Sequence, residues 1–302
     1  SITARSIMQL LPANGRIARG RITFRGAGGE GIEIAAQKPK GAVMRGLRGN
    51  AIAMIFQEPM TSLSPIYTVG QQIAETLILH RRMTRAEARR RAIELLERVH
   101  IPGAGTRVDA YPHQLSGGMR QRVMIAMAIA CGPRLLIADE PTTALDVTIE
   151  AQVLELLQEM QAETHAALIM ITHDLGVIAE TVEEVAVMYV GRVVETGSTA
   201  EVLGEPQHPY TQALLRSIPR IGWRERLEPI EGTVPSLLNL PRGCSFAPRC
   251  PAAMPRCRAA EPPPFSLGPE RQVRCLLHEP WVPHERDAAR GRGPEGAFPD
   301  PS

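Results

Sequence analysis

Leu135-Leu136-Ile137-Ala138-Asp139-Glu140-Pro141 is the stretch that decides the fold, because four apolar residues in a row end in two carboxylates. A continuous apolar run bounded by charge is typical of a central strand in a parallel sheet, where both faces are buried. In open α/β sheets, ligands bind at the carboxyl ends of such strands. The stretch therefore predicts a strand that carries Asp139 and Glu140 to a binding edge, although a strand with an acidic turn is the commoner explanation of this motif taken alone.

The neighbouring segments extend this strand into a sheet flanked by helices. Asp146 can cap an amphipathic helix, and Thr84 with Glu87 forms the pattern of a capping box. We predict helices at 84–100, about 117–131 and 146–162, strands at 22–24, 32–34, 51–56 and 167–171, and a hairpin at 185–190 and 192–195. The alternation of strand, helix and strand implies a parallel α/β sheet.

Size and composition limit what the chain can be. Its 302 residues, 44% of them hydrophobic, can bury one main core and leave a smaller appended unit. No apolar run approaches the roughly 18 residues that a membrane-spanning helix needs, so a membrane role would come through partners. The formal net charge is +2, with arginines interspersed among acidic residues, which argues against a dedicated nucleic-acid protein with a basic stripe.

Three other segments place polar groups at strand ends or at the start of a helix. Gln57 follows the strand at 51–56, and His173 follows the strand at 167–171. Ser116-Gly117-Gly118 opens a helix, where unpaired N–H groups and glycine backbone favour a phosphate. Each segment alone has a structural explanation, as a cap, a structural histidine or an ordinary glutamine. Chance is nevertheless a poor explanation for their shared order along the chain, which is Gln57, Ser116, Asp139-Glu140, Asp146 and His173.

This order of motifs resembles that of the ABC ATPases. The matching segments are Gln57 for the Q-loop, Tyr111 to Arg122 for the signature, Leu135 to Glu140 for the Walker B strand, Ala144-Leu145-Asp146 for the D-loop and His173 for the switch histidine. The resemblance covers essentially the whole chain. It implies an α/β fold of the P-loop NTPase type, with an ABC ATPase domain at 1–204 that includes a helical subdomain at about 62–132.

The resemblance also implies roles for these residues toward ATP and Mg²⁺. Asp139 would hold Mg²⁺, usually through water, and Glu140 would act as general base on the water that attacks the terminal phosphate. Gln57 would reach the Mg²⁺ or that water, and His173 the terminal phosphate. ABC ATPases work as head-to-tail pairs, so Ser116 and Gly118 would act on ATP held mainly by a partner. The wider set of nucleotide-binding residues that the resemblance implies includes Gly117, Gln121 and Asp146.

A phosphate-binding loop of the form G-x-x-x-x-G-K-S/T is absent from the sequence. The only lysines, Lys38 and Lys40, follow no such loop, and the G-x-G-x-x-G match at 26–31 is predicted to be a hairpin loop because no helix follows it. The opening run 1–8 resembles the helix after the phosphate loop, which makes Ser1 the last hydroxyl of that loop and a Mg²⁺ ligand. We therefore expect an N-terminal truncation just after the loop's lysine, and no ATP hydrolysis by this polypeptide alone.

The C-terminal part narrows the family. The segments that look like the extension of oligopeptide and dipeptide permease ATPases are His208-Pro209-Tyr210-Thr211, Ile230 to Pro235, Gly243 to Phe246 and Arg249-Cys250-Pro251. We expect this extension at 205–282, followed by a disordered tail at 283–302. The resemblance implies two membrane permease subunits, an extracytoplasmic substrate-binding protein, a second and sister ATPase, and a peripheral position on the cytoplasmic face of the inner membrane.

Four of the five cysteines gather in this extension, at Cys244, Cys250, Cys257 and Cys275. Four thiolates suffice for a 4Fe–4S iron–sulfur cluster, which the resemblance implies for many members of the subfamily. Tetrahedral zinc is the main alternative, although its sites usually include a C-x₂₋₄-C pair, which this segment lacks. Unliganded thiols also stay open, whereas disulfides do not suit a cytosolic ATPase. Cys131 is expected to be a small core residue.

Two functions remain open from the sequence. The first is an ATP-hydrolysing subunit that energises the import of di- and oligopeptides or similar small solutes. The second is a non-catalytic regulatory subunit that contributes only its signature to a partner's site. An ABC protein of DNA repair or translation is disfavoured, because the tail is of the permease type and no basic stripe is present. The transported substrate would touch the permeases and the binding protein, so the ATPase sequence does not reveal it.

Overall fold

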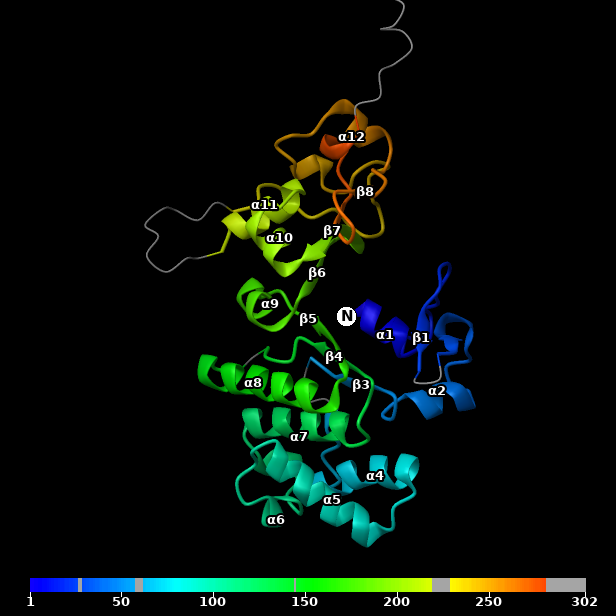
Figure 1. Cartoon of the computed structure of the whole chain (residues 1–302), viewed down its shortest axis with the longest axis vertical. Helices are drawn as coiled ribbons and strands as arrows, with labels where there is room; N and C mark the ends of the chain where they lie inside the picture. The colour runs from blue at the N-terminus through cyan, green and yellow to red at the C-terminus, as the bar shows by residue number, and fades with distance from the viewer. Residues whose placement is uncertain (27–28, 58–61, 144, 219–228, 281–302) are drawn as a thin grey trace, which may run out of the picture. The chain divides into compact units, whose positions relative to one another are not determined.

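The computed structural model describes residues 1–26, 29–57, 62–143, 145–218 and 229–280 (Figure 1). The chain divides into two compact units, Ser1–Thr181 and Val182–Ser302. Ala144 of the predicted D-loop and the tail predicted to be disordered at 283–302 lie outside the described residues. Within the described residues, no helix is both long enough and apolar enough to cross a membrane.

A three-stranded parallel sheet organises the first unit, with the strand of the Asp139-Glu140 motif in its centre. The strands are β3 (Ile52–Ile55), β4 (Leu135–Asp139) and β5 (Ala167–Ile171), and β4 pairs with both neighbours. The pairing aligns Ile55 with Ala138, and Ala138 with Met170. The carboxyl ends of the strands therefore share one edge, as predicted from the apolar run.

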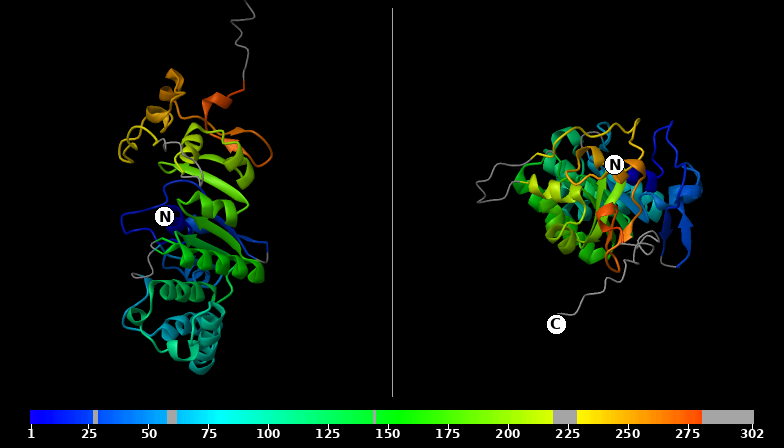
Figure 2. Two further views of the ribbon diagram at one scale, coloured as in Figure 1. Left: turned by 90° about the vertical axis from the view of Figure 1, so that its left-hand side faces the viewer. Right: turned by 90° about the horizontal axis from the view of Figure 1, so that it is seen from above.

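The side chains of this sheet alternate between two apolar cores, which explains why its central strand is apolar throughout. Ala53, Ile55, Leu136 and Ala138 belong to a core shared with the helices α4 (Val69–Arg81), α5 (Arg85–Arg98), α7 (Gly117–Ile129) and α8 (Val147–Thr164). Ile52, Met54 and Ile137 belong to the opposite core, with residues of α1 (Ile2–Ile7) and α2 (Ala42–Leu47). Both faces are thus covered by protein, with α7 and α8 on the same face (Figures 1 and 2).

Local sequence signals account for most of the remaining elements of this unit. Thr84 and Glu87 form the predicted capping box at the start of α5, and Thr68 with Gln71 forms a second one at α4. The strands β1 (Thr23–Arg25) and β2 (Gly31–Glu33) pair antiparallel, which confirms a hairpin around the G-x-G-x-x-G match, although residues 27–28 themselves are outside the description. The short elements are η1 (Ile34–Ala36), α6 (Ala104–Arg107), η2 (Pro112–Gln114) and α9 (Leu175–Thr181).

The second unit is built on an antiparallel sheet of order β6-β7-β9-β8. Its strands are β6 (Glu184–Tyr189), β7 (Arg192–Ser198), β8 (Phe265–Ser266) and β9 (Gln272–Val273), and its helices are α10 (Thr199–Gly204), α11 (Pro209–Arg216), η3 (Ala247–Arg249), α12 (Pro255–Ala259) and η4 (Leu276–His278). The units divide earlier than the boundary predicted at 204, because the hairpin β6–β7 shares a sheet with strands from the extension. Tyr189 of β6 forms an aromatic cluster with Tyr210 and Phe246, in which the ring centroids are 4.6–5.5 Å apart.

Candidate functional site

Glu140 is the centre of a hydrogen-bonded group at the carboxyl edge of the parallel sheet. The backbone N–H of Glu140 donates to the carbonyl of Ile171 at 2.8 Å, and its φ of +50° turns the chain out of β4. Its Oε2 accepts hydrogen bonds from Gln57 Nε2 at 2.6 Å and from Thr143 Oγ1 at 2.9 Å. Its Oε1 lies 3.4 Å from Nδ1 of His173. Two residues predicted from separate motifs, Gln57 and His173, therefore meet at the predicted Glu140 carboxylate.

The surroundings of Glu140 keep its carboxyl group ionised at neutral pH. Burial raises its pKa, but the hydrogen bonds from Thr143, His173 and Gln57 outweigh burial, so that the pKa lies below the ordinary glutamate value. The histidine side chain is 78% exposed, whereas that of Glu140 is 25% exposed. An ionised carboxylate can accept a proton, and the exposed imidazole beside it is free to meet a ligand that arrives from solvent.

Asp139 and Ser1, the two residues predicted to bind Mg²⁺, lie side by side. The backbone nitrogen of Ser1 contacts the Asp139 carboxylate, whose side chain is only 6% exposed. Ser1 is also the N-terminal cap of α1. Because Asp139 directly precedes Glu140, the Ser1–Asp139 contact lies at the same edge of the sheet as the Glu140 group.

The signature residues are arranged around the first turns of α7. Ser116 caps this helix, since its Oγ accepts a hydrogen bond from the Met119 N–H at 3.3 Å. Gly118 lies against α8, where an added Cβ would come within 2.8 Å of Ile149 Cγ2. An added Cβ at Gly117 would meet no atom within 4 Å, so packing inside this chain does not require that glycine.

Gln121 and Asp146 serve the fold directly. Gln121 is 1% exposed, and its Nε2 donates to the Pro141 carbonyl at 2.6 Å, which joins α7 to the turn after Glu140. Asp146 is the cap of α8 and accepts a hydrogen bond from the Ile149 N–H at 3.0 Å. In the isolated chain these two predicted nucleotide-binding residues thus have structural partners.

Thr143 is the residue of this site that the sequence analysis missed. Its hydroxyl donates to Glu140, three residues earlier in the chain. The available signal was a hydroxyl close behind the second carboxylate, in Pro141-Thr142-Thr143. Such a hydroxyl is common in any turn, so the sequence alone does not single it out.

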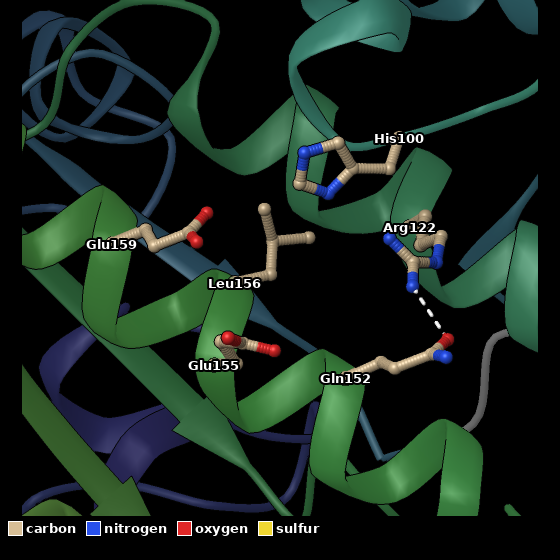
Figure 3. A pocket seen from close by; sticks show the side chains of 6 residues that line it. All are labelled: His100, Arg122, Gln152, Glu155, Leu156 and Glu159. Carbon is tan, nitrogen blue, oxygen red and sulfur yellow. Dashed lines mark hydrogen bonds between the residues drawn. The ribbon is translucent and has the colours of Figure 1, made fainter.

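A cavity of about 370 Å³ opens elsewhere in the first unit, between α7, α8 and His100, which follows α5 in the chain (Figure 3). It is lined by His100, Arg122, Gln152, Glu155, Leu156 and Glu159. Arg122 donates to the Gln152 amide oxygen at 2.9 Å and to the Val99 carbonyl at 2.8 Å. No residue predicted for ATP, Mg²⁺ or metal lines this cavity, so it is separate from the Glu140 group.

The four clustered cysteines line one small cavity of about 20 Å³ in the second unit. All four are free thiols. Burial raises the pKa of Cys244, Cys250 and Cys275, and that of Cys275 reaches about 11. The four cysteines therefore share one space, and the three whose pKa is raised keep their protons at neutral pH. As folded, however, no group of three or more histidine, cysteine, aspartate or glutamate side chains among the described residues is arranged to hold a metal ion.

His208 lines the same cavity and was not among the predicted metal ligands. Its ring is 1% exposed. Burial lowers its pKa to about 4, and the nearby His278 acts in the same direction. The imidazole is therefore neutral at physiological pH.

The fold and the strand-end group together define an ATPase of the ABC class. A family model described as ABC transporter matches residues 1–143. A dimeric ATP-binding cassette solved in a post-hydrolysis state with ADP and Pi superimposes with a TM-score of 0.56 at 26% identity, covering 66% of this chain and 79% of that one. The predicted P-loop ATPase fold is confirmed.

The chain belongs to the ATP-binding subunits of the oligopeptide/dipeptide ABC transporters. A family model for the oligopeptide/dipeptide transporter C-terminal region matches residues 194–257. The dipeptide transport ATP-binding protein DppD of Escherichia coli is 50% identical over 276 residues, which cover 91% of this chain and 82% of DppD. The oligopeptide transport ATP-binding protein AppD of Bacillus subtilis is 54% identical over 234 residues, or 77% of this chain and 71% of AppD. The predicted family is confirmed, and the comparisons give no support to the non-catalytic alternative.

Proposed function

We propose that this ATPase subunit uses the Glu140 group to hydrolyse ATP and so energises peptide import. The observation that carries the proposal is the ionised Glu140 carboxylate, held by Gln57 and Thr143 on one oxygen and approached by His173 on the other. A carboxylate held in this way at a strand edge is suited to accept a proton from an attacking water. Hydrogen bonds on Oε2 fix the orientation of the group, which leaves Oε1 to polarise the water.

The neighbouring residues have complementary roles in the proposed reaction. Asp139, with Ser1 beside it, supplies oxygen ligands of the kind that Mg²⁺ prefers, and the ion would neutralise charge on the phosphates. The exposed ring of His173 is placed to contact the terminal phosphate. Gln57 reaches the same space from the end of β3 and would orient the water or the ion.

We propose further that the signature acts on a nucleotide held by a second ATPase, as in a head-to-tail pair. The similar cassette is a dimer bound to ADP and Pi, which supports such pairing. Ser116 and the unobstructed backbone at Gly117 open α7, and a helix start attracts phosphate. A sister ATPase, two membrane permeases and an extracytoplasmic binding protein would complete the transporter, with this chain peripheral on the cytoplasmic face of the membrane.

The test of the hydrolytic role is Glu140→Gln in the transporter assembled with its permeases and partner ATPase. Loss of a general base typically lowers the rate by about 10²–10⁴-fold, so ATP turnover should fall by at least about 100-fold while ATP still binds. Glu97→Gln on the exposed face of α5 is the matched control and should retain full turnover. Retention of most of the turnover in Glu140→Gln would sink the assignment.

We also propose that Cys244, Cys250, Cys257 and Cys275 hold a 4Fe–4S cluster. The four thiols surround one cavity, which supports a shared ligand role. The thiols must turn toward one another and lose their protons to bind the cluster, since no ligand arrangement is present among the described residues. When bound, the cluster would supply four metal–sulfur cross-links within the second unit and a one-electron redox couple.

Metal and acid-labile sulfide analysis of anaerobically purified protein tests the cluster. About four irons and four sulfides per chain are expected for a 4Fe–4S centre. Zinc without sulfide would show the tetrahedral alternative instead, and an absence of both metals would leave four free thiols. Cys131→Ser is the matched control, because Cys131 is buried in the first unit and should leave the metal content unchanged.

A further inference from the structure

A row of polar side chains on α8 runs along the cavity of Figure 3, and the middle of this row has no counter-charge. The members of the row recur at helical spacing and so share one face of α8, namely Gln152, Glu155, Glu159 and Glu163. At its two ends the row contacts arginines of other helices, because Gln152 accepts a hydrogen bond from Arg122 and Glu163 forms an ion pair with Arg98. Between them, the carboxylates of Glu155 and Glu159 have neither an ion pair nor a hydrogen bond with the described part of the chain. Two like charges four residues apart repel each other, so this pair favours a cation beside it.

Arg122 of α7 also lines the cavity and is a buried cation without a negative partner. The residue is 9% exposed, and its guanidinium donates to the Val99 carbonyl at 2.8 Å and to the Gln152 amide oxygen at 2.9 Å. Both acceptors are neutral, and Arg122 forms no ion pair with any other described residue. A buried charge is costly without a counter-charge, and a guanidinium has five N–H donors. Arg122 is therefore suited to bind an anionic group that enters the cavity.

The two kinds of charge lie on different sides of the cavity. Figure 3 shows Arg122 with Gln152 on one side and the carboxylates of Glu155 and Glu159 on the other. Leu156 lies between them and supplies an apolar surface. The cavity is thus complementary to a ligand that carries a positive group at one end and a negative group at the other.

The chemistry of the lining narrows the class of this ligand. A coordinated metal ion is not a suitable cation, because no group of three or more histidine, cysteine, aspartate or glutamate side chains among the described residues is arranged to hold one. An ammonium group needs only hydrogen-bond acceptors, and two carboxylates provide them. The volume of about 370 Å³ is near the lower end for ligand pockets, which favours a small molecule. An ammonium and a carboxylate joined in one small molecule describe an amino acid or a short peptide.

The spacing of the charges along α8 indicates the length of the ligand. Glu155 and Glu159 lie three and seven residues beyond Gln152, which holds Arg122. With the rise of an α-helix, these separations are about 4.5 and 10.5 Å along the axis. An extended dipeptide spans about 7 Å, so its two ends reach both charged sides.

We propose that this cavity is a binding site for a short zwitterionic peptide, with a dipeptide as the best match in length. The ammonium group of the peptide donates hydrogen bonds to Glu155 and Glu159, and its carboxylate accepts them from Arg122. Because Arg122 belongs to the signature helix α7, the bound peptide joins this helix to α8. The site is separate from the Glu140 group, so the proposal does not depend on ATP hydrolysis.

The first experiment is a calorimetric titration of the full chain with three probes: alanyl-alanine, N-acetyl-alanyl-alanine and alanyl-alanine amide. The acetyl group removes the positive charge of the peptide, and the amide removes the negative charge. We expect saturable binding of alanyl-alanine with a Kd of about 1 mM, as suits a ligand of this size. Each blocked peptide should bind at least about 10-fold more weakly, because it loses a charge-assisted hydrogen bond.

The second experiment repeats the alanyl-alanine titration with variants of α8. Glu155→Gln combined with Glu159→Gln removes the negative charge and should weaken binding at least about 10-fold. Gln152→Glu gives Arg122 a carboxylate partner within the chain, so it should weaken binding by a similar factor. Its urea unfolding should be unchanged or shifted to higher urea, which shows that the loss does not arise from unfolding. Glu150→Gln is the matched control, because Glu150 lies on the same helix outside the cavity and should leave the affinity unchanged.

Three results would overturn the proposal. The first is no saturable binding of alanyl-alanine to the unchanged chain below about 10 mM. The second is an amidated or acetylated peptide that binds as tightly as alanyl-alanine, since the cavity would then recognise only one charge or neither. The third is an unchanged affinity in the double glutamate variant or in Gln152→Glu. None of these results bears on ATP turnover, which Glu140→Gln tests separately.

Discussion

Replacement of Gly118 by alanine tests whether the packing of α7 on α8 requires a glycine. A Cβ at this position would lie 2.8 Å from Cγ2 of Ile149. Carbon atoms pack best at about 3.5–4.0 Å, so the new methyl group would overlap the isoleucine by about 1 Å. Because Cγ2 branches directly from Cβ, it cannot move aside unless the whole side chain leaves its preferred rotamer.

Two opposing contributions set the expected change in the free energy of unfolding. Overpacking a filled interior costs about 1–3 kcal/mol. Alanine in place of glycine within a helix recovers about 0.5–1 kcal/mol. We therefore expect Gly118→Ala to lower the free energy of unfolding by about 1 kcal/mol.

The assay is urea unfolding of four proteins: the unchanged chain, Gly118→Ala, Ile149→Ala and the double variant. Without the isoleucine the overlap disappears, so Gly118→Ala should become neutral or stabilising, with an interaction energy of about 1–2 kcal/mol. Gly117→Ala is the matched control, because its Cβ would meet nothing within 4 Å and should leave stability unchanged or raised. Additive effects of the two substitutions, or equal losses at both glycines, would refute the steric explanation.

Three further perturbations follow from individual contacts. Thr143→Val removes a hydrogen bond that lowers the pKa of Glu140, so that pKa should rise. A general base loses activity as pH falls through its pKa, so the acidic limb of the transporter's pH profile of ATPase activity should move to higher pH. An unmoved acidic limb would count against this role of Thr143. Gln121→Leu leaves the Pro141 carbonyl without its donor and should lower the free energy of unfolding in urea by about 1–3 kcal/mol, whereas an unchanged value would contradict that contact. With a pKa of about 11, Cys275 of the metal-free protein should react with iodoacetamide about tenfold faster per pH unit up to roughly pH 10, as followed by mass spectrometry; a rate that levels off near pH 8.5 would disagree.

The elements that follow local rules were predictable from the sequence. β4 was predicted because both of its faces are buried, so that its apolar run is continuous. The capping box of α5 begins at Thr84, as its Thr-x-x-Glu pattern indicates. The meeting of Gln57 and His173 at Glu140 followed from parallel strands that end at one edge. In each case the signal lies within a few residues or in a single rule of sheet topology.

The contacts that depend on long-range packing were not predictable. β8 and β9 have two residues each, too few for any alternation to show, and they are ordered by pairing with β7. Gln121 lies in the signature, yet its bond to Pro141 depends on how α7 packs against the sheet. The burial of His208 likewise depends on residues distant in the chain, such as Phe246. The cysteine grouping was predicted, but not the small cavity that the four residues line together.

The contact between the Gln121 amide and the Pro141 carbonyl has a consequence for a pair of such subunits. Its two ends concern different nucleotides in the proposed dimer, since α7 begins with the signature and Pro141 follows the hydrolytic carboxylate. A displacement of α7 by the partner's nucleotide would therefore be transmitted to the turn after Glu140 through the hydrogen bond between Gln121 and Pro141. In this subunit, the signature helix that serves the partner's nucleotide is thus joined to the hydrolytic turn by one hydrogen bond.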